Sequence, residues 1–229
     1  MNLFGDAFEF VFSGREAATG GVTVGGPEQV LDLAARQLEV TLFALAVAII
    51  LAMPLGLWLG HRQRGEFLAV SVGNAGRALP ELALIALMAA AIGVGMINLV
   101  VALAILGIPP ILTNTYVGIT QVDRASVEAA RGMGMTEFAI VRKVELPLAV
   151  PMIMGGVRTA TINIIATATI APLAGILTLG DFIIARNVYG DAGVLAGAVL
   201  VALMALALEG ILAGLQWSLT SKGLKLKRP

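Results

Sequence analysis

Long apolar runs, separated by short polar segments, set the pattern of this chain. Residues 40–59 are twenty consecutive positions without a charged side chain. At a rise of 1.5 Å per residue, a helix of that length crosses the roughly 30 Å hydrocarbon core of a bilayer. This criterion predicts membrane-spanning helices at residues 40–59, 70–92, 97–117, 148–173 and 193–215. We therefore expect an all-α membrane protein of five transmembrane helices, with a transmembrane domain over residues 37–221.

The boundary between the second and third spans depends on residues 82–112, which form an almost unbroken apolar run. The run is too long for one span and too short for two. If the second span starts near Val70 and includes Arg77 and Glu81, residues 93–95 can form the turn to the third span. Because Arg77 and Glu81 are four residues apart, we expect them to pair on one helical face.

Residues 1–36 precede the first span and are expected to form an arm and linker outside the membrane. Four phenylalanines stand among acidic residues in the first twelve positions, a stretch too short to span but typical of an interfacial segment. It lacks the basic start of a cleaved signal peptide. Glycines crowd residues 13–26, which predicts a flexible linker, and Pro27 suits the first turn of a helix.

Residues 121–147 are charged and helix-forming, although apolar runs flank them on both sides. Asp123 can cap a helix that ends in a glycine turn at Gly134, and Thr136 can cap a second helix that stops before Pro147. Helices of about ten residues are marginal alone in water. We therefore expect this pair to be held by something against which it docks.

The distribution of basic residues predicts the orientation in the membrane. Five spans place the loop after residue 59, the segment 121–147 and the C-terminal tail 222–229 on one side. That side carries ten of the fifteen lysines and arginines: Arg62, Arg64, Arg124, Arg131, Arg142, Lys143, Lys222, Lys225, Lys227 and Arg228. The positive-inside rule puts this side in the cytoplasm and the N-terminus outside.

Composition narrows the function. The chain is 58% hydrophobic and 13% charged, against roughly 25% charged residues in soluble domains. Its zero net charge gives no reason to expect a nucleic-acid partner, and its lack of cysteine excludes disulfides and thiolate metal sites. The chain has a single histidine, no phosphate-binding loop pattern and no recognisable catalytic constellation. We expect a non-enzymatic membrane subunit without a metal or cofactor of its own.

The polar segment resembles the EAA loop of ABC importer permeases. Glu128-Ala129-Ala130 is followed after three residues by Gly134, and after nine more by Val144-Glu145-Leu146-Pro147, with valine where the usual pattern has isoleucine. Further stretches narrow the resemblance to permeases of glycine betaine, carnitine and choline importers: Asn114-Thr115-Tyr116, Gly156-Val157-Arg158-Thr159-Ala160 and Gly197-Ala198. The likeness runs from about Gln37 to Leu224. One departure is Gly175–Asp181, where many relatives have a more glycine-rich segment.

This resemblance implies a type I ABC importer permease of the bacterial cell membrane, working by alternating access. The loop would be the coupling helix that fits a groove on an ATPase subunit, and ATP and magnesium would bind that subunit. The further partners implied are a second permease, either another copy or a paralogue, an extracytoplasmic substrate-binding protein and membrane lipid. The substrate would be glycine betaine, choline or a related osmoprotectant. Two alternatives are an ABC permease for an amino acid such as methionine and, from a different class, a self-contained secondary transporter.

Two groups of residues are candidates for function. The ATPase-coupling candidates are Glu128, Ala129, Ala130, Gly134, Leu146 and Pro147. The translocation-path candidates are Arg158, Thr159, Asn163 and Thr167, the last three forming a polar stripe at four-residue spacing. Arg158 is costly at membrane depth, so it either pairs with Glu81 or Glu209 or lines an aqueous vestibule.

Two further patterns in the spans bear on packing and on substrate affinity. Gly193 with Gly197, and Gly210 with Gly214, have the spacing that lets helices approach closely. Quaternary ammonium ligands are held by aromatic cages, but the chain has only two tryptophans and two tyrosines. Substrate affinity is therefore expected to lie on the separate binding protein.

Overall fold

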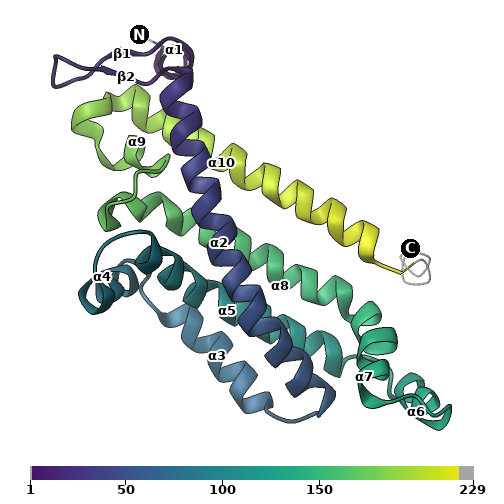
Figure 1. The fold of residues 1–229 in the computed structure, drawn as a ribbon. Helices are drawn as coiled ribbons and strands as arrows, with labels where there is room; N and C mark the ends of the chain where they lie inside the picture. The colour runs from purple at the N-terminus through teal and green to yellow at the C-terminus, as the bar shows by residue number, and fades with distance from the viewer. Residues whose placement is uncertain (1, 222–229) are drawn as a thin grey trace. The chain divides into compact units, whose positions relative to one another are not determined.

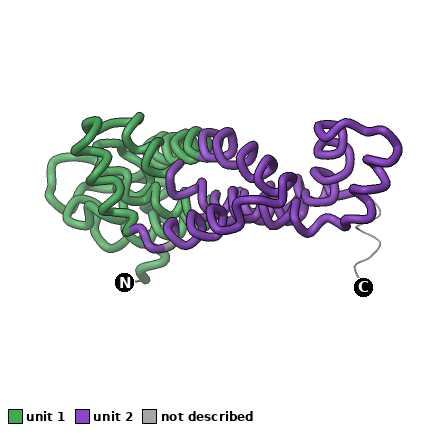
Figure 2. The backbone as a smooth tube through the Cα atoms, turned by 90° about the horizontal axis from the view of Figure 1, so that it is seen from below, with its two compact units in different colours: residues 1–44, 80–103, 163–207 green, residues 45–79, 104–162, 208–229 purple. Residues whose placement is uncertain are grey.

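The computed structural model describes residues 2–221, without the side chain of Arg77. The basic tail predicted at 222–229 lies outside this range. The chain packs as two compact units, each assembled from three stretches of sequence (Figure 2). Unit 1 consists of residues 1–44, 80–103 and 163–207, and unit 2 of residues 45–79, 104–162 and 208–229.

Within residues 2–221, four helical stretches are long and apolar enough to cross a membrane: Gly26–His61, Met96–Thr120, Glu137–Ala174 and Arg186–Leu219. The first is α2, the second α5 and the last α10 (Figure 1). The third contains α7 Glu137–Ile140, a π-helical turn at Val141–Glu145, α8 Leu146–Thr167 and a 3₁₀ helix at Ala168–Ala174. A fifth span exists if the shorter helices α3 Glu66–Ala78 and α4 Glu81–Ile92 count as one.

The single helix expected over residues 70–92 is broken between α3 and α4. Leu79 is extended, with ψ 122°, and Pro80 has φ −68° and ψ 117°. Proline disfavours the helical conformation of the residue before it, and the surrounding apolar run hid this signal in the sequence. Arg77 and Glu81 therefore do not share one continuous helix. The predicted turn at residues 93–95 is present, since Gly93 and Gly95 both have positive φ.

The arm before α2 is ordered where a flexible linker was expected. Helix α1, Leu3–Ser13, leads into a hairpin of β1 Arg15–Glu16 and β2 Thr23–Val24, with Arg15 opposite Val24. Gly20 and Gly21 both have φ +79° in its turn, a backbone region that side chains disfavour. Ala18 N–H donates to the Val188 carbonyl at 2.9 Å. The glycines thus serve a specific turn that packs on the rest of unit 1.

The core of unit 1 is built around three aromatic rings from distant segments. Phe10 of α1 packs edge-on against Phe182 of α9 (Gly180–Ile184) and against Tyr189 of α10. Gly197 lies beside them, because a Cβ there would come within 2.8 Å of the Phe182 Cβ. Its predicted role in close helix approach is confirmed. No described atom lies within 4 Å of a Cβ at Gly210 or Gly214.

Small residues also let the helices of unit 2 approach closely. A Cβ on Gly56 of α2 would lie 2.7 Å from Thr115 of α5, and one on Gly156 of α8 would lie 2.6 Å from Asn114. Gly73 of α3 meets Thr113 in the same way. Helix α5 thus touches three other helices of unit 2 through glycine contacts.

Candidate functional site

Two short helices in unit 2, α6 Arg124–Gly132 and α7, form the segment that the sequence singled out (Figure 1). The Asp123 carboxylate accepts hydrogen bonds from the backbone of Ala125 and Ser126, each at 3.3 Å, and so caps α6. Thr136 caps α7 by accepting from Ala139 N–H. Gly134 has φ +83° between them. Both caps and the glycine turn are where the sequence predicted them, because such signals act within a few residues.

One face of this segment packs against the rest of unit 2. Val127 and Ala130 of α6 and Ile140 of α7 are buried with Ile119 of α5 and Ile153 of α8. The pair of helices is therefore fixed to the ends of α5 and α8. Ala130, which was expected to contact the ATPase, has its side chain in this core, because α6 turns that face towards the spans.

The opposite face of the segment is exposed. Glu128 and Ala129 are exposed, and no described atom lies within 4 Å of a Cβ at Gly134. Two large apolar side chains lie on the same segment, Met133 at 77% and Phe138 at 75% exposure. Neither was selected from the sequence, although apolar residues beside a glycine turn in a charged segment could have indicated them. Because three of them were predicted to contact an ATPase, we call Glu128, Ala129, Met133, Gly134 and Phe138 the exposed coupling face.

The sequence predicted that the second short helix stops before Pro147. In the structure the helix instead continues through a π-helical turn into α8. Leu146 N–H donates to the Val141 carbonyl five residues back, which is the π-helical pattern. This wider turn directly precedes Pro147, whose ring would meet the carbonyl four residues earlier in a regular helix. Leu146 and Pro147 are half-buried at the start of α8. Residues 121–147, which we call the coupling segment after their predicted role, are consequently continuous with a span.

His61, the last residue of α2, ties the first span to this segment. Its Nδ1 lies 2.7 Å from Glu145 Oε2 and its Nε2 lies 3.1 Å from Glu137 Oε2. Glu145 is buried, whereas Glu137 is exposed and also pairs with Arg131 at 2.9 Å. Each ring nitrogen of His61 therefore has a carboxylate oxygen within hydrogen-bonding distance.

This connection was missed in the sequence, where the lone histidine was given little weight. His61 and Glu145 are 84 positions apart, and no local pattern relates them. The usable signal was Glu145 itself, a charged residue next to Leu146-Pro147 at the start of an apolar run. On the exposed side of the network, the Glu137 carboxylate raises the pKa of Arg131 through a hydrogen bond and its charge.

Arg158 of α8 pairs with Glu209 of α10. Of the two acidic partners that the sequence offered, Glu81 and Glu209, the structure thus selects Glu209. Its Nε donates to Glu209 Oε1 at 2.8 Å, and its Nη1 donates to Gln216 Oε1 at 2.9 Å. Gln216 in turn donates to the Pro151 carbonyl. The charge is thus compensated within unit 2, as a polar group in a membrane span requires.

The polar stripe predicted on α8 holds only in part. Thr159 and Asn163 are exposed, whereas Thr167 is buried at the end of the helix. Each step of four residues rotates a position by about 40° around a helix of 3.6 residues per turn, so Thr167 lies about 80° from Thr159. That rotation carries Thr167 off the exposed face.

Comparisons with known proteins identify the family. A family model described as "Binding-protein-dependent transport system inner membrane component" matches residues 52–216. The chain is 38% identical over 204 residues to the glycine betaine/carnitine/choline transport system permease protein OpuCB of Bacillus subtilis, covering 89% of this chain and 93% of that protein. It is 38% identical over 191 residues to the choline transport system permease protein OpuBB of the same organism, covering 83% and 88%.

The fold is also that of a solved transporter. An inward-facing structure of the MetNI methionine ABC transporter aligns with a TM-score of 0.72 at 19% identity, covering 84% of this chain and 96% of that one. At this identity the similarity concerns the fold alone, and it confirms the type I ABC importer permease fold expected from the sequence. The chain belongs to the family of binding-protein-dependent transport system inner membrane components.

Proposed function

We propose that this chain is the permease subunit of an ATP-driven importer for glycine betaine, choline or a related quaternary ammonium osmoprotectant. The exposed coupling face carries the mechanistic part of the proposal, because it presents two large apolar side chains on a segment that is otherwise charged. Exposed apolar residues of this kind mark protein interaction sites. The substrate class rests on the relatives that are 38% identical and are named for these substrates.

The coupling face would fit a groove on a separate ATPase subunit, which would bind ATP and magnesium. Glu128 can meet basic groups there, while Met133 and Phe138 can fill apolar pockets. A push on this face would be transmitted to α5 and α8 through the buried Val127 and Ile140, and to α2 through His61. In this mechanism ATP binding moves three spans together, and a second permease, identical or paralogous, completes the path.

The exposed part of α8 supplies the candidate lining of the translocation path. Thr159 and Asn163 offer polar groups that can exchange hydrogen bonds with a hydrated substrate. Arg158 would repel a quaternary ammonium ion if it stood alone, but its pairing with Glu209 neutralises that charge. The proposed path is therefore polar without being cationic.

The orientation in the proposal follows from the basic residues. We place the coupling segment in the cytoplasm and the N-terminal arm outside the bacterial inner membrane. A substrate-binding protein would deliver the osmoprotectant on the outer side. An amino acid such as methionine is the second candidate substrate, and a self-contained secondary transporter is the alternative from another class.

ATP hydrolysis by the reconstituted complex tests the proposal. The chain is assembled with the ATPase and binding protein encoded beside its gene and supplied in turn with glycine betaine, choline, carnitine and methionine. Stimulation by a quaternary amine supports both the coupling and the substrate class. Stimulation by methionine alone would overturn the substrate, and uptake without any ATPase would overturn the permease function.

A further inference from the structure

Helix α1 of unit 1 has an apolar surface wider than the face with which it packs. Phe4, Phe8 and Phe12 follow one another at four-residue spacing and lie on one side of the helix. The acidic Asp6 lies on the opposite side, and the exposed Glu9 lies at the edge between the two sides. A helix with this division suits a boundary between an apolar and an aqueous phase.

The orientation of α1 is fixed by contacts on its buried side. Phe10 has no exposed surface, and its ring lies 5.1 Å from that of Phe182 and 6.2 Å from that of Tyr189. Gly25, at the end of the hairpin, has room only for a hydrogen, because a Cβ would lie 2.5 Å from the Phe10 carbonyl oxygen. With this side buried, Phe4, Phe8 and Phe12 remain 71%, 67% and 59% exposed.

The exposed phenylalanines form one wall of an apolar groove, and α10 forms the other. The groove has a volume of about 420 Å³, and Phe4, Phe8, Phe12, Val199, Leu200 and Leu203 are among its apolar lining residues. Val199 and Leu203 are exposed residues of a candidate membrane span. The groove is therefore continuous with an exposed apolar stretch of a candidate membrane span.

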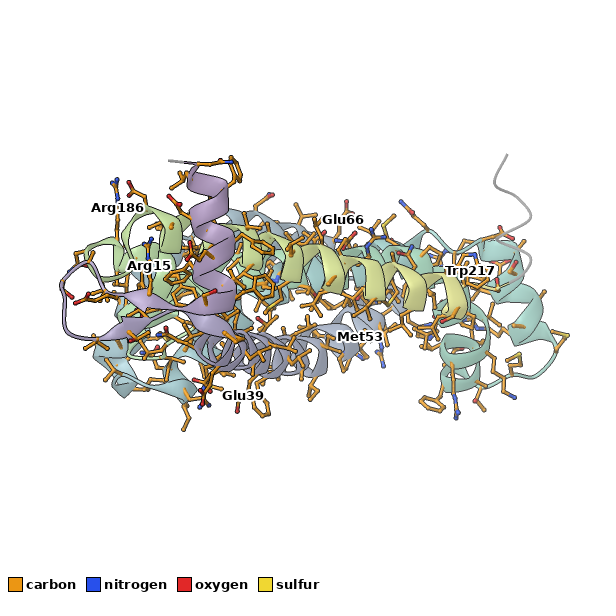
Figure 3. The ribbon with its side chains drawn as sticks, turned by 90° about the horizontal axis from the view of Figure 1, so that it is seen from above. Arg15, Glu39, Met53, Glu66, Arg186 and Trp217 are labelled. Atoms are coloured by element: carbon orange, nitrogen blue, oxygen red, sulfur yellow. The ribbon has the colours of Figure 1, made fainter. Side chains whose placement is uncertain are left out.

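We propose that α1 lies in the membrane–water interface and that phospholipid acyl chains occupy this groove. An acyl chain is long, flexible and wholly apolar, and so matches a groove whose lining side chains are all apolar. The acidic Asp6 and Glu9 exclude attraction to anionic headgroups as the source of binding. Arg15, which lies in the hairpin directly after α1 (Figure 3), donates to the Tyr189 carbonyl at 2.6 Å and stacks over the Phe10 ring.

The contact with lipid would anchor the N-terminal end of α2, because α1 and the hairpin lead directly into that span. It depends on the membrane location of the chain and not on the proposed substrate. The same face could instead meet another protein, such as the binding protein or a second permease. That occupant gives a different result in the test below.

Site-directed spin labelling of the complete transporter in phosphatidylcholine nanodiscs tests the proposal. The chain contains no cysteine, so Phe8→Cys and Phe12→Cys each give one label site on it, and partner subunits without reactive cysteines are used. Glu9→Cys, an exposed site at the acidic edge of the same helix, is the matched control. Collision with oxygen, which enriches in the hydrocarbon phase, is compared with collision with a water-soluble nickel chelate.

We expect the ratio of oxygen to nickel collisions to be several-fold higher at positions 8 and 12 than at position 9. Equal nickel accessibility at all three positions would overturn the proposal, since α1 would then stand in water. Low accessibility to both reagents at positions 8 and 12 would also overturn it, because a protein would then cover the face. Each variant is first checked for wild-type ATP hydrolysis, which shows that the complex has assembled.

Discussion

Replacing His61 with alanine removes the group that lies between the end of α2 and the coupling segment. Glu145, at 4% side-chain exposure, would then keep a buried carboxylate without this partner. Breaking a fully buried ion pair costs about 3 to 5 kcal/mol. His61 is 16% exposed, and water can enter the space left by its ring, so we expect a loss of about 2 to 3 kcal/mol.

This loss should be visible in both stability and coupling. For a chain of this size, 2 to 3 kcal/mol corresponds to a fall in Tm of roughly 5 to 10 °C, measurable by thermal unfolding of the purified complex. In proteoliposomes we expect ATP hydrolysis to continue while substrate uptake per ATP falls, because α2 is released from the coupling segment. Arg62→Ala is the control. Arg62 is next to His61 in the sequence, but its side chain is exposed and stacks on Trp58, outside the network that His61 forms with Glu137 and Glu145.

A double-mutant cycle distinguishes the pair from general damage. Glu145→Leu alone leaves the His61 imidazole with Glu137 as its remaining partner and an apolar side chain at its other nitrogen, whereas Glu145→Leu combined with His61→Ala removes both members of the buried pair. We expect the double variant to recover part of the Tm lost by His61→Ala. The reasoning is refuted if the two losses add, or if His61→Ala behaves like Arg62→Ala. Glu137→Gln should change Tm little, because that carboxylate is exposed.

Three further variants test the coupling face and the charge pair in the spans. Gly134→Asp should leave the chain inserted but uncoupled, because the new aspartate side chain would project from the exposed coupling face. Wild-type uptake by this variant would contradict the prediction. Gly132→Asp, at a helical φ, is the control. Phe138→Ala should change stability by less than about 0.5 kcal/mol but weaken ATPase binding by about 2 kcal/mol; an unchanged Kd in a pull-down titration would exclude its role. Glu209→Gln should lower the folded fraction, since it leaves the charge of Arg158 without its carboxylate partner at a cost of about 2.5 to 3.5 kcal/mol. Exchanging Arg158 and Glu209 for one another should restore the folded fraction. A fully stable Glu209→Gln variant would show that water compensates the charge.

Features set by a few neighbouring residues could be read from the sequence. Asp123 and Thr136 cap their helices and Gly134 takes a positive φ, because each signal depends only on local backbone geometry. The apolar runs likewise indicated the spans, because span length is set by bilayer thickness. Within those runs the breaks were harder to place. Pro80 breaks a helix, whereas Pro147 follows a π turn and is carried through.

Contacts between distant segments could not be read from one sequence. The pairing of His61 with Glu145 requires the end of α2 to reach the start of α8, and the choice of Glu209 for Arg158 requires α8 to lie beside α10. The burial of Ala130 beside the exposed Ala129 depends on the rotation of α6 about its axis. These residues were visible as unusual, but their partners are set by packing.

The contacts of the coupling segment indicate how it can pass on a movement. Val127 and Ile140 are buried with residues of α5 and α8, and His61 adds α2 through a buried carboxylate. Separating these elements would expose apolar surface at about 25 cal/mol per Å² and leave a charge unpaired. Within unit 2 the segment and the ends of three spans should therefore move as one body. A push on the exposed coupling face would then reach all three helices together, which is what an importer needs if ATP binding on one subunit is to open a path in another.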